Sequence, residues 1–120
     1  MKVQEVTGAL LDYWVARAEG WTFGPPHRTH EWDVWRDSDG SIVGTIPAQA
    51  FQPSTDWAQA GPIIERERIA LDPLTRQGTT GEWVAQITGP CQFADTPLGA
   101  AMRAYVASKF GDEVPDEVTT

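Results

Sequence analysis

The segment that begins at Thr96-Pro97 constrains the fold more than any other part of the chain. Thr96 offers a capping hydroxyl, and Pro97 suits the first position of a helix, where a backbone N–H has no helical partner to lose. Apolar side chains then recur along one face, at Leu98, Met102, Tyr105, Val106 and Phe110. Because Gly111 follows as a stop signal, the sequence predicts a helix over 96–110 whose apolar face packs against a sheet.

A second helix is predicted near the start of the chain. Thr7 can cap its first turn, and Gly20 stands where a left-handed residue would end it. Apolar residues repeat between them at helical spacing, at Leu10, Leu11, Trp14, Val15 and Ala18. This pattern predicts a helix over 7–19.

Two stretches predict strands. Asp37-Ser38-Asp39-Gly40 is typical of a hairpin turn, because Asp-Gly supplies the positive φ that tight turns need. Apolar residues flank that turn, at Trp32, Val34 and Trp35 before it and at Ile42, Val43 and Ile46 after it. Apolar and polar residues also alternate from Glu82 to Ile87, which indicates a half-buried strand. Connections are predicted at 24–26, 47–53 and 75–81.

The secondary structure of the central segment, residues 54–70, is predicted only in part. Ser54-Thr55-Asp56 gives three side chains that can cap a helix, so we expect a short helix over Asp56–Ala60, interrupted by Gly61-Pro62. Residues 62–70 then fit either a further helical turn that begins at Pro62 or an edge strand. The pattern does not separate these two alternatives.

These elements predict an α+β fold: a small antiparallel sheet packed with N-terminal and C-terminal helices, plus a short central helix or loop. In 120 residues, two independent cores would each be marginally stable, so we expect one core. Six tryptophans supply much of its apolar area. Residues 1–111 are the predicted domain, and 112–120 are predicted to be an acidic, frayed tail.

The composition limits the setting of the protein. Cys91 is the only cysteine, so no intramolecular disulfide can form, and a reducing compartment is expected. No stretch resembles a signal peptide or a membrane span, which predicts a cytoplasmic protein without a membrane partner. The net charge of −8 repels a phosphate backbone, so duplex nucleic acid is an unsuitable partner. A small anion in a local basic pocket, or a basic protein, remains compatible with that charge.

No catalytic residue, metal site or cofactor is predicted. His27 and His30 share a loop, but no cysteine is nearby and only Glu31 and Asp33 offer carboxylates, which is not a usual ligand set. Cys91 has no nucleophile signature around it, and isolated cysteines usually fill apolar space. The carboxylate pairs Asp37/Asp39 and Glu65/Glu67 fit a turn and a solvated face better than a hydrolytic site.

The stretch from Pro53 to Arg66 is the candidate ligand site. It gathers hydroxyls, a carboxylate, an indole, an amide and a guanidinium, from Ser54, Thr55, Asp56, Trp57, Gln59 and Arg66. Ser54 and Thr55 would donate to phosphate or ribose, Asp56 would accept from a base edge or orient the loop, and Trp57 would stack. Arg66 or Arg103 would neutralise an anion. The alternative is structural: the hydroxyls only cap, Trp57 only fills the core, and Arg66 only pairs with a glutamate.

Three blocks of the sequence resemble the signature blocks of the NinX-like phage proteins. They are Thr7-Gly8-Ala9-Leu10-Leu11-Asp12 with Ala18-Glu19-Gly20, then Ser54-Thr55-Asp56-Trp57-Ala58-Gln59-Ala60-Gly61-Pro62 running to Glu67, and Thr96-Pro97-Leu98-Gly99-Ala100-Ala101-Met102 running to Lys109. Two departures stand out: Ala60-Gly61 replaces a usual pair of glycines, and residues 90–95 form a longer link into the last helix. The resemblance implies an accessory protein of tailed phages and prophages, placed in the host cytoplasm, with no established reaction.

The leading functional hypothesis is therefore a binding protein that captures a small anionic ligand, nucleotide-like and planar, as a counter-defence against host immune signals. We expect a homo-oligomer, because small capture proteins often build pockets between subunits. The alternative hypothesis is an acidic interaction protein or nucleic-acid mimic that blocks a basic host protein. A hydrolase of a signalling nucleotide is the third class.

Overall fold

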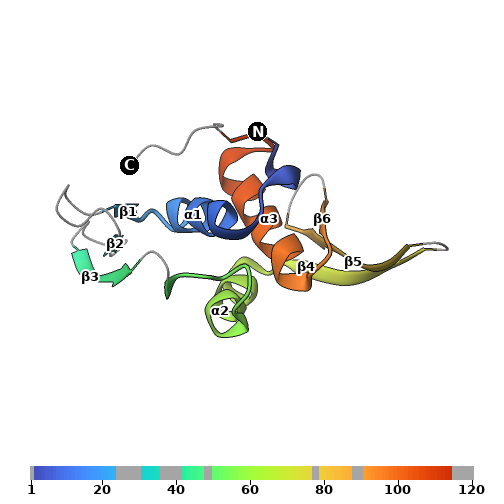
Figure 1. The fold of residues 1–120 in the computed structure, drawn as a ribbon, viewed down its shortest axis with the longest axis horizontal. Coiled ribbons are helices and arrows are strands. Elements are labelled where there is room, and N and C mark those ends of the chain that lie inside the picture. Colours follow the sequence, from blue (N-terminus) through green and yellow to red (C-terminus); the bar gives the residue numbers. More distant parts are fainter. Residues whose placement is uncertain are drawn as a thin grey trace.

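The structure is a computed structural model that describes residues 2–23, 31–35, 42–47, 50–76, 79–87 and 91–114. Its helices are the 3-10 helix η1 (Val3–Glu5) and the α-helices α1 (Gly8–Ala18), α2 (Trp57–Glu67) and α3 (Pro97–Phe110). Its strands are β1 (Thr22–Phe23), β2 (Glu31–Trp35), β3 (Ile42–Pro47), β4 (Ala70–Arg76), β5 (Thr79–Gln86) and β6 (Gln92–Ala94). The fold is α+β, as predicted, with α1, α2 and α3 between two groups of strands (Figure 1).

Helix α3 lies at the centre of the fold, where it packs against β4, β5, β6 and α1 (Figure 1). The Thr96 hydroxyl accepts a hydrogen bond from the Gly99 N–H at 3.0 Å, so the predicted cap is confirmed. The predicted face is buried at Leu98, Met102, Tyr105 and Val106, but Phe110 at its end is 41% exposed, so the prediction is wrong for that residue. Burial extends further round the helix than predicted, because Ala100, Ala101 and Ala104 let neighbouring elements approach closely. The prediction that this helix packs on a sheet is confirmed.

The sheet under α3 is antiparallel, in the order β4-β5-β6. Leu71, Ala85 and Gln92 face one another across its three strands. The strand predicted over Glu82–Ile87 is confirmed by β5. The connection predicted over 75–81 is wrong at both ends, since β4 runs to Arg76 and β5 begins at Thr79. Threonines at 75, 79 and 80 favour extended backbone, because their β-branched side chains fit a pleated surface.

The second sheet is also antiparallel, in the order β1-β2-β3. Its β2–β3 hairpin confirms the strands predicted on either side of 37–40. The predicted turn itself, and the predicted break at 24–26, lie outside the described residues. The antiparallel pairing was predicted from the sequence, but its division into two three-stranded sheets was not.

Helix α1 confirms the helix predicted over 7–19, and Gly20 follows it with a φ of 86°. Thr7 stands at the N-cap position, but its side chain makes no capping hydrogen bond, so the predicted cap is wrong. Its core face includes Leu11 and Val15, which are buried against α3. The Trp14 ring meets the Phe110 ring edge to face, with centroids 5.5 Å apart. The first and last predicted helices therefore pack directly on each other.

Helix α2 differs from the prediction. It runs from Trp57 to Glu67 without a break at Gly61-Pro62, so the predicted end at Ala60 is wrong. Pro62 removes the N–H that would bond the Ala58 carbonyl, but Ala58 is exposed and water can satisfy that carbonyl. Arg68 then takes a left-handed conformation, with φ of 54°, and β4 starts two residues later. The two alternatives for residues 62–70 therefore both occur, one after the other: the segment begins as helix and ends as strand.

The two ends of the described chain lie together. The Val3 N–H donates to the Asp112 carbonyl at 2.9 Å, and Lys2 forms an antiparallel bridge with Glu113. Val114 is buried. Residues 112–114 of the predicted tail therefore pack against the N-terminal segment, while 115–120 lie outside the described residues. None of the described helices is long and apolar enough to cross a membrane.

Candidate functional site

The start of α2 is held by polar contacts among residues of the predicted site. Asp56 caps the helix, because its Oδ1 accepts from the Ala58 N–H at 2.9 Å. Its Oδ2 accepts from Gln59 Nε2 at 3.0 Å. Gln59 also donates to the Ala50 carbonyl at 2.9 Å and accepts from the Gln52 N–H at 2.8 Å. Asp56 and Gln59 thus close the loop that precedes the helix.

Ser54 and Thr55 lie in different environments. Ser54 is buried, and its N–H donates to Oδ1 of Asp12 on α1 at 2.8 Å. Its hydroxyl lies against the same carboxylate without reaching hydrogen-bond geometry. Burial raises the pKa of Asp12, and the bond from Ser54 opposes that rise. Thr55 is exposed, and its hydroxyl donates to the Gln52 carbonyl at 3.4 Å.

Trp57 is the first residue of α2, and 55% of its surface is exposed. It therefore does not fill the core, which removes one part of the structural alternative. An exposed indole is available for contact with a ligand or a protein.

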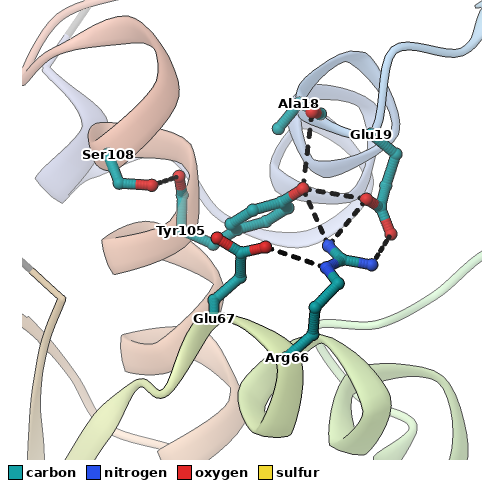
Figure 2. Close-up of polar contacts among 6 residues, drawn as sticks. All are labelled: Ala18, Glu19, Arg66, Glu67, Tyr105 and Ser108. Carbon is teal, nitrogen blue, oxygen red and sulfur yellow. Dashed lines mark hydrogen bonds and ion pairs between the residues drawn. The ribbon is translucent and has the colours of Figure 1, made fainter. Parts of the chain in front are cut away.

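Arg66 connects the three α-helices (Figure 2). Its Nη1 and Nη2 donate to the two carboxylate oxygens of Glu19, at 3.3 and 2.8 Å. The same Nη2 donates to the Tyr105 hydroxyl at 3.0 Å, and that hydroxyl donates to Glu19 at 2.8 Å. Nε donates to Glu67 at 2.8 Å. We call this cluster of Glu19, Arg66 and Tyr105 the three-helix node.

The electrostatics of the node keep Arg66 charged and Tyr105 neutral. Burial alone would lower the pKa of Arg66, but hydrogen bonds with Glu67 and Glu19 raise it above its ordinary value. Burial raises the pKa of Tyr105 well above its ordinary range, and Glu19 adds to that rise. The Tyr105 hydroxyl therefore remains a hydrogen-bond donor throughout the physiological pH range.

A pocket of about 390 Å³ opens beside the node. Its lining residues come from the end of α1, the segment before α2 and α2 itself: Glu19, Trp21, Ala50, Phe51, Gln59, Pro62, Ile63 and Arg66. The Trp21 and Phe51 rings pack against each other, with centroids 4.6 Å apart. The wall is mainly apolar, with polar groups at Glu19, Gln59 and Arg66, which is the usual make-up of a small-molecule site.

A scan against protein-family models matches residues 2–109 to the family described as "Bacteriophage P22, NinX". The chain belongs to this NinX family. No curated protein matches it. The family membership confirms the resemblance of the three sequence blocks.

In this member of the NinX family, each of the three blocks contributes one residue to the node. Glu19 belongs to the first block, Arg66 to the second and Tyr105 to the third. A second link joins the first two blocks, from Ser54 to Asp12. The blocks are therefore joined in space by specific polar contacts as well as by the shared core.

The predicted site residues do not all come together in the structure. Gln59 and Arg66 line the pocket, whereas Ser54, Thr55, Asp56 and Trp57 do not. Arg103 lies elsewhere. Its side chain is buried and donates to the backbone carbonyls of Val6, at 2.9 Å, and Phe93. Burial lowers the pKa of Arg103, and the nearby negative charge of Asp95 partly opposes this lowering.

Sequence reasoning missed Glu19, Trp21 and Phe51. Glu19 and Trp21 flank the glycine that ends the first helix, and Phe51 lies in a connection that carries no periodic pattern. Glu19 could have been inferred only indirectly, because an arginine such as Arg66 is expected to pair with a carboxylate. Nothing in the local pattern pointed to Trp21 or Phe51.

The remaining candidates for chemistry are few among the described residues. Cys91 is exposed, so the expectation that it fills apolar space is wrong. No group of three His, Cys, Asp or Glu side chains within the described ranges could hold a metal ion. His27, His30, Asp37 and Asp39 lie outside those ranges.

Proposed function

We propose that this NinX-family protein is a binding protein that captures a small, planar, nucleotide-like molecule in the pocket between α1 and α2. The observation that carries the proposal is the pocket itself, which has an aromatic wall at Trp21 and Phe51 and hydrogen-bonding groups at Glu19, Gln59 and Arg66. Its volume of about 390 Å³ falls within the range of small-molecule sites.

The chemistry of the pocket suits a flat ring with a polar edge. Aromatic and aliphatic side chains remove the faces of such a ring from water, and this burial supplies most of the affinity. Polar groups at the rim then fix its orientation. A capture protein needs no further chemistry, because it acts by lowering the free concentration of its ligand.

The phage origin of the family suggests a biological role for ligand capture. A protein made in an infected bacterium that binds a host signalling nucleotide would weaken an immune response that depends on that signal. Counter-defence is therefore the role that we propose for the binding activity.

A second candidate function rests on Trp57. Its exposed indole lies at the start of α2, on a chain whose net charge is −8. An acidic protein with an exposed aromatic anchor can bind a basic site on a host protein, since aromatic residues are enriched at interfaces. This interaction would use a surface outside the pocket.

The test is purification of the chain from phage-infected bacteria, followed by native mass spectrometry. The proposed function predicts an added mass of a few hundred daltons or more that denaturation releases intact; the same spectrum counts the copies in any oligomer. Returning the released compound should raise the melting temperature by mass action. A bare protein that no nucleotide stabilises would refute capture, and salt-sensitive co-purification of a basic host protein would favour the second candidate.

A further inference from the structure

The cation beside the pocket is already paired with carboxylates. Arg66 is the only cation among the described residues that line it, and it contacts two carboxylates, Glu19 and Glu67, each at 2.8 Å. One positive charge with two negative ones leaves this cluster negative. A phosphate placed beside it would be repelled unless it displaced Glu19 from Arg66.

Displacing Glu19 is unfavourable because the carboxylate is held twice. Its side chain is only 16% exposed, and it accepts hydrogen bonds from Tyr105 as well as from Arg66. An anion that took Arg66 away would leave a mostly buried carboxylate with one partner fewer. Such a group carries a large desolvation cost.

The node nevertheless retains hydrogen-bonding capacity at one end. A guanidinium has five N–H donors, and the bonds to Glu67, Glu19 and Tyr105 use four of them. The fifth donor is on Nη1. That atom lies 3.3 Å from Glu19 Oε1, which accepts no other bond from the described residues. Figure 2 shows this end of the ion pair directed away from Tyr105. A donor and an acceptor therefore stand side by side.

Resting on the proposed function, we infer that the pocket takes the uncharged, heterocyclic end of its ligand. The ligand presents an acceptor to Arg66 Nη1 and an adjacent N–H donor to Glu19 Oε1, as the edge of a nucleobase does. Trp21 and Phe51 cover its apolar surface. Phosphate groups add no affinity, and Arg66 orients the ring edge instead of neutralising an anion. This replaces the role that the sequence suggested for Arg66.

Nucleosides and their 5′-monophosphates separate this inference from the proposed function. The probes are adenosine, guanosine, cytidine and uridine with the four matching monophosphates, measured by isothermal calorimetry at low and high salt. We expect at least one nucleoside to bind, its monophosphate to bind no more than about twofold more tightly, and salt to have little effect. Monophosphates that bind at least about tenfold more tightly, with salt-sensitive affinity, would overturn the inference and keep the proposed function. Binding of none of the eight would overturn both.

A pair of variants tests the role of Glu19. Glu19→Gln removes the charged acceptor and should weaken nucleoside binding by about tenfold or more, the size of one lost charge-assisted hydrogen bond. It should also free Arg66, so that the monophosphate becomes the tighter ligand. Glu65→Gln makes the same change of charge at an exposed position outside the pocket lining and should bind as the parent does. Equal effects of both variants would overturn the inference.

The parent protein supplies a readout that needs no mutation. In NMR spectra, the bound nucleoside should shift the indole signal of Trp21, which lines the pocket, and leave that of the exposed Trp57 unchanged. Shifts at Trp57 alone would place the ligand elsewhere and overturn the assignment, even if Glu19→Gln failed to fold.

Discussion

Arg66 Nη2 lies 2.8 Å from Glu19 Oε2, although 47 positions separate the two residues in the sequence. The pair joins the end of α1 to the last turn of α2, and Tyr105 joins both to α3. Glu19 and Arg66 also line the pocket. One contact thus couples the packing of the helices to the shape of the candidate site.

A double-mutant cycle measures that coupling. Arg66→Lys and Glu19→Gln should each destabilise the protein by about 1 kcal/mol, because Arg66 is half exposed and solvent screens the pair. The two effects should not add, since either change removes the paired geometry. Urea denaturation of the four proteins gives the coupling energy. Strictly additive effects would show that the two side chains contribute independently.

The buried face of α3 makes the strongest prediction for stability. Met102 is fully buried, so Met102→Asp should cost several kcal/mol by placing an unpaired charge in the core. Ser108→Asp, at an exposed position of the same helix, is the matched control; it loses the hydroxyl's bond to the Tyr105 carbonyl and adds a negative charge near the helix end, so it should cost only about 1 kcal/mol. Thermal unfolding compares them. A Met102→Asp protein that melts with the parent would contradict the packing described for α3.

Asp12 gives a prediction that depends on pH. Burial raises its pKa above the ordinary 3.8, so ionisation costs stability in the folded state, and this loss develops as pH rises through the raised value. Asp12→Asn removes that cost and keeps an acceptor for the Ser54 N–H, while the new amide can donate to the Ser54 hydroxyl. The variant should therefore gain stability relative to the parent at pH 7, and the gain should disappear below about pH 4. A gain that is equal at both pH values would rule out the titration of Asp12 as its cause.

Cys91 should be dispensable. It is exposed and lies outside the pocket lining. Cys91→Ser should keep both the melting temperature and the retained ligand of the parent. A folded variant without ligand would instead give the thiol a functional role.

The sequence predicts best those helices whose capping residues and apolar face lie within the helical segment itself. Thr96 and Gly111 mark the ends of α3, and a periodic apolar face lies between them. The length of α2 was missed because local propensity penalises Pro62, whereas contacts far along the chain hold the last turn. Pro62 costs one hydrogen bond at an exposed carbonyl, and the tertiary contacts of Arg66 outweigh it.

The candidate site was predictable only in part. The segment around α2 was recognised because its polar residues are close in sequence, and Gln59 and Arg66 do line the pocket. The rest depends on tertiary structure. Trp21 and Phe51 are 30 positions apart in the printed sequence, and no local pattern brings their rings together.

The central claim is that the pocket beside Arg66 holds the ligand, and a pair of tryptophan variants tests it most directly. Trp21→Leu alters the pocket wall, whereas Trp57→Ala alters the exposed surface that the second candidate function would use. Each is purified from infected bacteria, checked for folding by its melting temperature, and analysed by native mass spectrometry. The account predicts that folded Trp21→Leu loses the bound mass and that Trp57→Ala keeps it. Retention by Trp21→Leu together with loss from Trp57→Ala would contradict the account.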